Sequence, residues 1–484
     1  MNRLLETDIT QPAANQDTPN QSSRALGRPV TSEATIAAQP ASALVRDSVK
    51  RTLFNMAFPM LAGTFAMTAY NLTDTWFVSR LGTLPLAAMG FTLPVVTLLT
   101  FVAGGLGTGV MTLVSHAIGR RARTEAARVA THGVTLAIMV SAAMTIAGYL
   151  SIDIVFTKLG ADAAALTLIG EYMRTWYLGA VFMSLPMLAN GILISVGDSK
   201  TASRMMLLGT ALNGVLDPIM IFGYLGCPAM GIRGAALATV IAQAIVSAWL
   251  FALLRWKHHL LIFRKARWGE YKAMSGRILR LGVPGMLSMT LMPISASVIT
   301  RLLSRFGSEA VAAAGTASRI EMFAFVVPMA LGICLTPFVS QNYGANRKDR
   351  IREALGLGTR FAFLYGGVIA GLFFVCARGI ARVFSSDPGV IDCLVAYMRI
   401  ISFGYGAMEV HRYCGFILTG LQKPIQTASL NAIRVFVLLI PLSWAGAYFY
   451  GVQGVFIGRL ATDLTAACIG LCWAHRAIQR APQR

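Results

Sequence analysis

The chain has 484 residues, of which 55% are hydrophobic and 13% are charged, and its mean hydropathy is +0.62. Soluble domains carry about 25% charged residues, so this composition excludes a soluble globular protein as well as disordered and collagen-like chains. The formal net charge of +21 arises from 42 basic and 21 acidic residues, and its meaning depends on where the basic residues lie.

The N-terminal segment differs in composition from the rest of the chain. Residues 1–50 are rich in Ser, Thr, Gln, Asn, Pro and Ala. They contain no apolar stretch of the kind that a secretory signal peptide requires. We therefore predict a disordered cytoplasmic tail over residues 1–50.

Twelve apolar segments follow this tail, separated by short polar or basic stretches. A helix needs about 20 apolar residues to cross a bilayer, and each segment is long enough. The sequence therefore predicts an all-α integral membrane protein with helices at 54–78, 86–113, 129–150, 164–195, 205–223, 231–254, 279–302, 311–338, 354–376, 390–419, 426–448 and 452–474.

The basic residues indicate how these helices are oriented. Most of them lie in the loops that follow the even-numbered segments and at the chain ends, whereas the opposite loops hold few, chiefly Arg80, Lys158, Arg305, Arg378 and Arg382. Cytoplasmic loops carry an excess of Lys and Arg. We therefore predict a bacterial cytoplasmic (inner) membrane protein with both termini in the cytoplasm, and we attribute the net charge to topology rather than to nucleic-acid binding.

The sequence also repeats itself. One constant shift aligns Pro59 with Pro284, Gly82 with Gly307, and Tyr172-Met173-Arg174 with Tyr397-Met398-Arg399, and a slightly smaller shift aligns Gly231 and Gly234 with Gly451 and Gly454. Six crossings return the chain to its starting side, so the halves have the same orientation. We predict two pseudo-symmetric six-helix bundles around a central cleft: an N-lobe at 51–254, a cytoplasmic linker at 255–278, a C-lobe at 279–475 and a C-terminal tail at 476–484. This arrangement is typical of transporters that work by alternating access.

Two acidic residues lie inside predicted membrane helices of the N-lobe. A charge at such a position costs about 2.5–3.5 kcal/mol on insertion scales, so these residues are functional candidates. Asp74 lies four residues after Tyr70, and Asp217 lies four residues after Asn213, which places each pair on one helix face. Pro218 lacks an N–H and is expected to kink the helix beside Asp217. These groups suit a proton relay or a sodium site.

The repeat provides a comparison for this pair of acids. The shift that aligns Pro59 with Pro284 places Ile299 at the position of Asp74, and the segment equivalent to Asn213 and Asp217 is apolar. The fold therefore does not by itself require the carboxylates. The alternative is that Asp74 only caps the outer end of its helix.

The C-lobe has acidic residues of its own. We predict ion pairs between Glu409 and Arg412 and between Asp463 and Arg459, from their spacing of three and four residues. Glu321 has no evident partner on its own helix. A substrate or sodium contact at Glu321 or Glu409 stays open.

No catalytic or metal-binding pattern stands out. The seven cysteines have no paired metal-type spacing, and we interpret His258 and His259 as residues of a solvated loop. There is no phosphate-binding loop for ATP. We therefore predict no enzyme activity, no cofactor and no metal other than sodium at Asp74, Asp217 and Asn213.

Three segments resemble the multidrug and toxic compound extrusion (MATE) family, in its DNA-damage-inducible (DinF-like) branch. They are Tyr-Asn-Leu-Thr-Asp-Thr-Trp-Phe-Val-Ser-Arg-Leu-Gly at 70–82, Asn213 to Pro218, and Gly-Ile-Arg-Gly-Ala-Ala-Leu-Ala-Thr at 231–239. The resemblance extends over about residues 50–475. It implies a hydrogen-bonded N-lobe cluster that takes up the coupling proton or sodium, formed by Tyr70, Asp74, Asn213, Asp217 and Thr239.

Together these features predict a secondary active multidrug efflux antiporter. The resemblance implies export of amphipathic organic compounds, often cationic, in exchange for protons by alternating access. The alternatives are a sodium-coupled exporter of the same family and a lipid-linked precursor flippase of the same superfamily. We expect a monomer in the lipid bilayer that binds small molecules and no nucleic acid.

Overall fold

The computed structural model describes residues 42–262 and 268–481, and within these ranges it contains helices and no strand. Residues 1–41, which make up most of the predicted tail, lie outside the described residues, and residues 42–50 form a short helix and the start of the next one. The helical elements are α2 (Ala43–Arg46), α3 (Val49–Ser79), α4 (Thr83–Gly119), α5 (Arg123–Lys158), α6 (Ala163–Leu178), α7 (Ala180–Ser195), α8 (Ser199–Phe222), η1 (Tyr224–Gly226), α9 (Gly231–Ala252), η2 (Leu253–Lys257), α10 (Trp268–Leu303), η3 (Ser304–Phe306), α11 (Ser308–Ala324), α12 (Val326–Gly344), α13 (Lys348–Phe384), α14 (Pro388–Ile401), η4 (Ser402–Gly404), α15 (Tyr405–Gly420), α16 (Pro424–Ala432), η5 (Ile433–Leu439) and α17 (Ile440–Gln479).

Twelve membrane crossings run through these elements. In the described ranges, eight helices are long and apolar enough to cross a membrane, and two bent helix pairs qualify when each pair counts as one crossing. The segment Pro424–Gln479 contains two crossings, because the backbone leaves the helical conformation at Tyr450 and Gly451. α3 does not meet the same test of apolarity, but it is 31 residues long and packs along α8, and we count it as the remaining crossing. The predicted all-α fold with twelve helices is confirmed.

Two of the predicted helices are each broken into two pieces. α6 and α7 meet at an angle of 50°, and α11 and α12 meet at 57°. Pro328 explains the second bend, since it lacks the N–H that would bond to the carbonyl of Ala324. The Tyr365 hydroxyl donates a hydrogen bond of 2.8 Å to that carbonyl instead. Periodicity in the sequence indicated both helices but neither bend.

The predicted duplication is visible in the backbone. Four positions with positive φ in the first half have a positive-φ partner in the second half at the predicted offsets: Gly82 and Gly307, Arg121 and Asn346, Gly197 and Gln422, and Gly231 and Gly451. Residues other than Gly rarely adopt this conformation. Its recurrence at equivalent turns shows that the two halves repeat the same fold.

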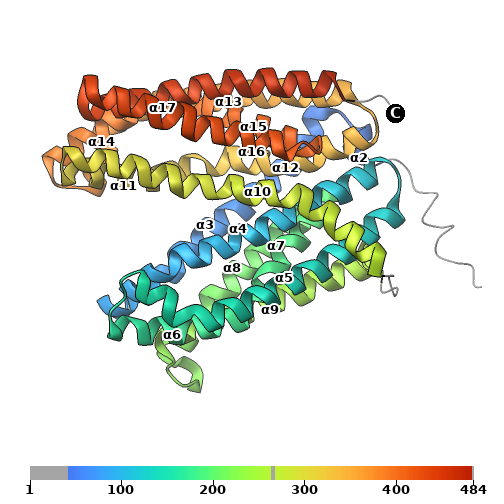
Figure 1. The fold of residues 1–484 in the computed structure, drawn as a ribbon, viewed down its shortest axis with the longest axis horizontal. Coiled ribbons are helices and arrows are strands. Elements are labelled where there is room, and N and C mark those ends of the chain that lie inside the picture. Colours follow the sequence, from blue (N-terminus) through green and yellow to red (C-terminus); the bar gives the residue numbers. More distant parts are fainter. Residues whose placement is uncertain (1–41, 263–267, 482–484) are drawn as a thin grey trace, which may run out of the picture.

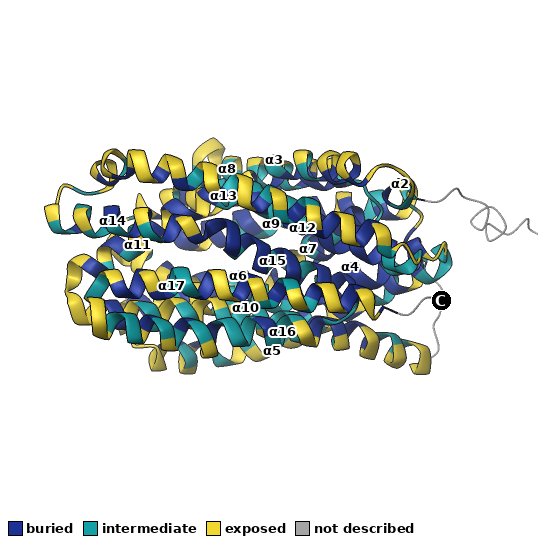
Figure 2. Ribbon diagram, turned by 90° about the horizontal axis from the view of Figure 1, so that it is seen from above, coloured by how far each residue is buried: buried dark blue, intermediate teal, exposed yellow. Residues whose placement is uncertain are grey.

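The two bundles approach each other at one end and diverge toward the other (Figure 1). We call the end that carries α2 and the C-terminus the closed end, and the opposite end the divergent end. α10 packs against α4 of the first bundle and against α16 of the second. Many residues on the outer surface are exposed (Figure 2). They include large apolar ones such as Leu150 at 76% and Val375 at 79%, as expected for a surface that faces lipid.

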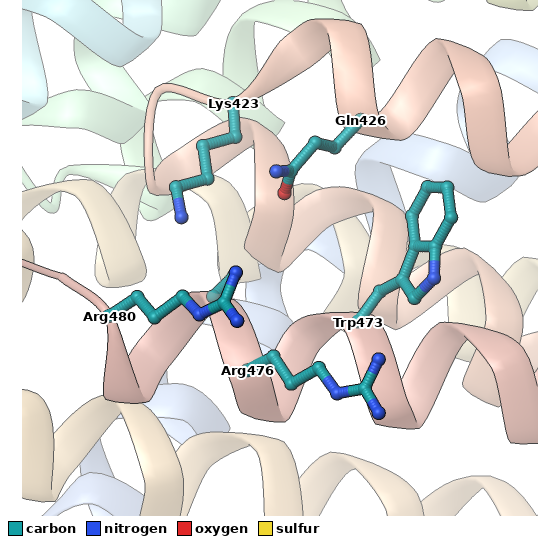
Figure 3. Close-up of a pocket in the computed structure, with 6 residues that line it drawn as sticks. Lys423, Gln426, Trp473, Arg476 and Arg480 are labelled. Carbon is teal, nitrogen blue, oxygen red and sulfur yellow. The ribbon is translucent and has the colours of Figure 1, made fainter.

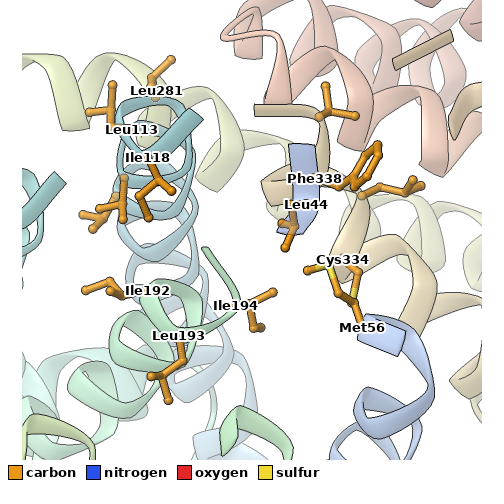
Figure 4. Packing of buried hydrophobic residues seen from close by; sticks show 14 of the residues in the cluster. Leu44, Met56, Leu113, Ile118, Ile192, Leu193, Ile194, Leu281, Cys334 and Phe338 are labelled. Carbon is orange, nitrogen blue, oxygen red and sulfur yellow. The ribbon is translucent and has the colours of Figure 1, made fainter. Parts of the chain in front are cut away.

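The buried side chains show the same asymmetry. One apolar cluster at the closed end combines residues of both bundles, including Leu113 and Ile192 of the first and Cys334 and Phe338 of the second (Figure 4). The other two clusters each lie within a single bundle. Among the described residues, the bundles therefore share an apolar core only at the closed end.

Polar contacts add to this shared core. The Ser340 hydroxyl donates to the carbonyl of Thr112 at 2.8 Å, and the Gln341 amide donates to the carbonyl of Ser195 at 2.5 Å. Gly119 and Gly344 allow the backbones to approach closely there, since a Cβ on either would clash with the backbone of the opposite bundle.

α2 also lies across this junction. Its Leu44 side chain is buried and packs beside Gly197 of the first bundle. Arg350 of the second bundle donates to the carbonyls of Leu44 at 3.1 Å and Asp47 at 2.5 Å, and to Asn342 Oδ1 at 2.8 Å. The N-terminal segment thus contacts both bundles at the closed end.

Candidate functional site

α3 and α8 lie side by side and run in the same direction. The Ser203 hydroxyl donates to the carbonyl of Pro59 at 2.5 Å, and the Thr210 hydroxyl donates to that of Ala66 at 3.1 Å. The two contacts join residues that are separated by the same distance along the chain. This constant separation fixes the register of the two helices.

The same register brings the two predicted carboxylates together. Thr73 of α3 packs beside Gly214 of α8, one helical turn before Asp217. Asp74 and Asp217 are both buried, at 7% and 0% exposure, and they interact electrostatically. Two acids that lie far apart in the sequence therefore share one site in the N-lobe.

Hydrogen bonds join the other predicted residues to this site. Tyr70 donates to Thr239 Oγ1 at 3.1 Å. The Asn213 amide donates to Thr239 Oγ1 at 3.2 Å and to Asp217 Oδ1 at 3.1 Å. We call Tyr70, Asp74, Asn213, Asp217 and Thr239 the N-lobe cluster. α3, α8 and α9 each contribute to it.

The N-lobe cluster has more acceptors than donors. Asp74 Oδ1, Asn213 Oδ1 and Asp217 Oδ2 are buried, and none of these atoms has a hydrogen-bond partner in the described part of the chain. Neither Asp74 nor Asp217 forms a salt bridge with a described residue. Buried acceptors normally have partners. Oxygen atoms in this arrangement suit a proton or a hard monovalent cation such as sodium.

Tyr172 is a further residue near the N-lobe cluster that no spacing from Asp74 or Asp217 indicates in the sequence. Tyr172 lies on α6, is buried, and interacts electrostatically with Tyr70, Asp74 and Asp217. The recurrence of Tyr-Met-Arg in both halves was the signal that pointed to this position. Its phenol is an additional donor that the fold places near the carboxylates.

Pro218 lies inside α8, which continues as one helix from Ser199 to Phe222.

The described residues contain no group of three or more His, Cys, Asp or Glu side chains arranged to hold a metal ion. His258, interpreted above as solvated, instead contacts Asp198 at 3.2 Å.

The corresponding part of the C-lobe holds a neutralised acid. Arg459 donates to both oxygens of Glu321, at 2.8 and 2.9 Å, and also to the Tyr397 hydroxyl. Tyr397 donates to Glu321 Oε1 at 2.8 Å. Glu321 thus has a partner on a helix far along the chain, which no spacing rule within one helix would reveal.

The predicted partner of Asp463 is wrong. Asp463 pairs with Arg434 at 2.6 Å, because Arg459 extends to Glu321 instead. The predicted pair of Glu409 and Arg412 is confirmed at 2.7 Å. The three membrane acids of the C-lobe therefore each have an arginine partner, in contrast to the two of the N-lobe cluster.

Comparisons with known families agree with this architecture. The MatE family model matches the chain twice, at residues 59–219 and 284–445. The two matches begin at Pro59 and Pro284, which are equivalent positions of the predicted repeat.

Similar proteins are transporters by name. The chain is 31% identical over 421 residues to the FAD transporter of Shewanella oneidensis, which covers 87% of this chain and 93% of that protein. It is 23% identical to the multidrug export protein MepA of Staphylococcus aureus, over 87% of this chain and 92% of that protein.

Solved structures of similar proteins have the same fold. The bent form of the Vibrio cholerae MATE transporter VcmN superposes with a TM-score of 0.85 at 27% identity, covering 90% of this chain and 98% of that one. An outward-facing multidrug resistance MATE family transporter of the MOP superfamily also gives 0.85 at 27% identity, covering 92% and 99%.

Proposed function

Because the chain belongs to the MATE family of membrane transporters, we propose that it exports amphipathic organic compounds, cationic ones among them, in exchange for protons by alternating access. Members of this family are transporters rather than enzymes, and they need no cofactor. The chain is a multi-pass membrane protein. We further propose that it functions as a monomer in the bacterial cytoplasmic membrane with both termini in the cytoplasm.

The single observation that carries proton coupling is the set of unpartnered oxygens in the N-lobe cluster. Two carboxylates share a buried site that contains no basic side chain within the described residues. Burying uncompensated charge costs several kcal/mol, so the site favours uptake of a balancing cation. A proton is the smallest such cation. Sodium, bound by Asp74, Asp217 and Asn213, is the alternative.

The bundle arrangement supports a route for the substrate. In this structure the bundles share a core at the closed end and diverge toward the end that carries Asp74. With the closed end in the cytoplasm, this is an outward-facing state. Protonation of the cluster from outside would remove negative charge and weaken the attraction for a bound cationic compound.

The coupling then follows from charge. Release of the compound accompanies uptake of the proton, and the protonated transporter reorients to discharge the proton into the cytoplasm. One charge crossing about 150 mV releases roughly 3.5 kcal/mol, which supports a concentration gradient of between two and three decades for a neutral substrate.

The test uses inverted membrane vesicles with an established pH gradient. Addition of an organic cation such as ethidium is expected to dissipate the gradient with the natural chain, but not with Asp74→Asn or Asp217→Asn at equal expression. Asp153→Asn, which alters an exposed acid on α5, is the matched control. Full activity of both cluster variants would reject the site. Dissipation that depends on sodium would identify sodium as the coupling ion.

A second candidate substrate is a flavin dinucleotide. The observation that favours it is the 31% identity to a protein named as an FAD transporter. Three partly exposed arginines, Arg412, Arg434 and Arg459, give the C-lobe groups that bind phosphate well when they are free of their acids. FAD uptake into the same vesicles, measured against ethidium uptake, distinguishes the two substrates.

A further inference from the structure

A basic cavity lies at the closed end of the C-lobe. It has a volume of about 230 Å³ and lies between the start of α16 and the end of α17 (Figure 3). Its lining consists of Lys423, Gln426, Trp473, Arg476, Ala477 and Arg480. Three of these side chains are cationic, and none is acidic.

The charges of this cavity are not balanced within the described part of the chain. Lys423, Arg476 and Arg480 form no ion pair with any described carboxylate, and Lys348 approaches the same place through a 3.5 Å hydrogen bond to the carbonyl of Gln479. Burial and the Arg480 guanidinium hold the pKa of Lys423 below its ordinary value. An anion in the cavity would relieve both this repulsion and the cost of burial.

The N-lobe shows what an anion does at the equivalent position. The repeat that pairs Gly82 with Gly307 also pairs Asp198 with Lys423, and the residues just before them, Gly197 and Gln422, share the positive φ noted above. Both Asp198 and Lys423 are the N-cap of their helix. The two positions are therefore structurally equivalent, but they differ in charge.

Asp198 balances the charge of nearby cations and caps α8 at the closed end of the N-lobe. Its carboxylate accepts from Lys257 Nζ at 2.7 Å, lies 3.2 Å from His258 Nε2, and accepts from the backbone N–H of Thr201 at 3.1 Å. α16, by contrast, has no side-chain cap at Lys423. The C-lobe also has cations and a helix N-terminus at this place, but it lacks the carboxylate.

We propose that the cavity binds the phosphate group of an anionic phospholipid, which supplies the negative charge that Asp198 supplies in the N-lobe. Phosphate suits several convergent Lys and Arg donors and an uncapped helix N-terminus. Basic pockets between membrane helices bind such headgroups. Trp473 favours a lipid over a free phosphate, because indole rings settle at the boundary between headgroups and acyl chains.

The experiment measures lipid adducts of the purified full chain by native mass spectrometry, with phosphatidylglycerol, phosphatidylethanolamine and inorganic phosphate as probes. We expect phosphatidylglycerol to bind at least tenfold more tightly than phosphatidylethanolamine. The triple variant Lys423→Gln, Arg476→Gln, Arg480→Gln is expected to lose this preference. The triple variant Arg121→Gln, Arg123→Gln, Arg128→Gln removes equal charge at the same end of the N-lobe and is expected to keep it.

Lys423→Asp gives the sharpest comparison, since it introduces the residue type that the N-lobe has at the equivalent position, Asp198. It is expected to abolish phosphatidylglycerol binding while raising thermal stability in lipid-free detergent. Unchanged binding in Lys423→Asp, or equal losses in the two triple variants, would overturn the site. Inorganic phosphate that binds as tightly as the lipid, and is lost in the same variants, would support the phosphate site and assign it to a soluble anion.

Discussion

Arg459 occupies in the C-lobe the position that Thr239 occupies in the N-lobe. The alignment that pairs Gly231 with Gly451 also pairs these two residues. Thr239 joins a site whose carboxylates have no basic partner, whereas Arg459 neutralises Glu321 with two hydrogen bonds. The guanidinium thus supplies in the C-lobe a positive charge that, among the described residues, the carboxylates of the N-lobe cluster do not have.

Replacing Arg459 with Thr should therefore destabilise the protein through Glu321. Removing one partner of a buried ion pair leaves an uncompensated charge and costs about 3–5 kcal/mol. We expect a clear decrease in the thermal unfolding temperature of the purified protein. Adding Glu321→Gln to Arg459→Thr removes that charge and is expected to recover most of the loss. A double variant as unstable as the single one would show that packing of the arginine, and not its charge, is what matters.

Replacing Thr239 with Val should weaken coupling without unfolding the protein. Val has nearly the same shape but cannot accept the hydrogen bonds from Tyr70 and Asn213. Each bond contributes about 1 kcal/mol, so we expect roughly a tenfold loss or more in affinity for the coupling ion. The readout is the external pH at which transport is half-maximal. Thr167→Val, on the exposed part of α6, is the control, and an identical pH profile for both variants would contradict the role of Thr239.

Asp198 is expected to stabilise the fold at neutral pH and to lose this effect in acid. Contacts with His258 and Lys257 hold the pKa of Asp198 well below its ordinary value. A lowered folded-state pKa stabilises the fold above the unfolded pKa of about 3.9, and this stabilisation disappears as the pH falls through the folded value.

Asp198→Asn keeps a capping side chain but loses the charge. Because Lys257 is half-exposed, we expect a loss of about 0.5–1 kcal/mol near neutral pH. The difference in unfolding temperature between the natural chain and Asp198→Asn should narrow below about pH 4. A difference that stays constant as the pH falls would indicate that the charge of Asp198 contributes nothing to stability.

Arg350 is expected to keep the closed end shut. It ties the second bundle to the N-terminal segment through the carbonyls of Leu44 and Asp47. In Arg350→Met we expect faster maleimide labelling of a cysteine introduced at Ser340, in a background without native cysteines. Arg352→Met, on the exposed face of α13, serves as the control. Equal labelling in the two variants would mean that these hydrogen bonds do not limit opening.

The sequence by itself determined the class of protein and most of its architecture. Apolar segments of membrane-spanning length indicated the helices, since the bilayer forces every backbone group to bond within its own segment. Internal repetition indicated the duplication, and the two buried carboxylates stood out because charge is scarce in membrane helices. Local spacing also sufficed for the pair of Glu409 and Arg412, whose partners lie on one helix face.

Only the tertiary structure decided which distant side chains meet. The pairs of Glu321 with Arg459 and of Asp463 with Arg434 join different helices, and their geometry depends on how those helices pack. Tyr172 reaches the N-lobe cluster for the same reason. The conformation with one closed end was likewise hidden from the sequence, because a transporter that works by alternating access, as we propose for this chain, uses one sequence for several packings of its two bundles. Helical periodicity specifies which face of a helix is apolar, but the register between helices comes only from their packing.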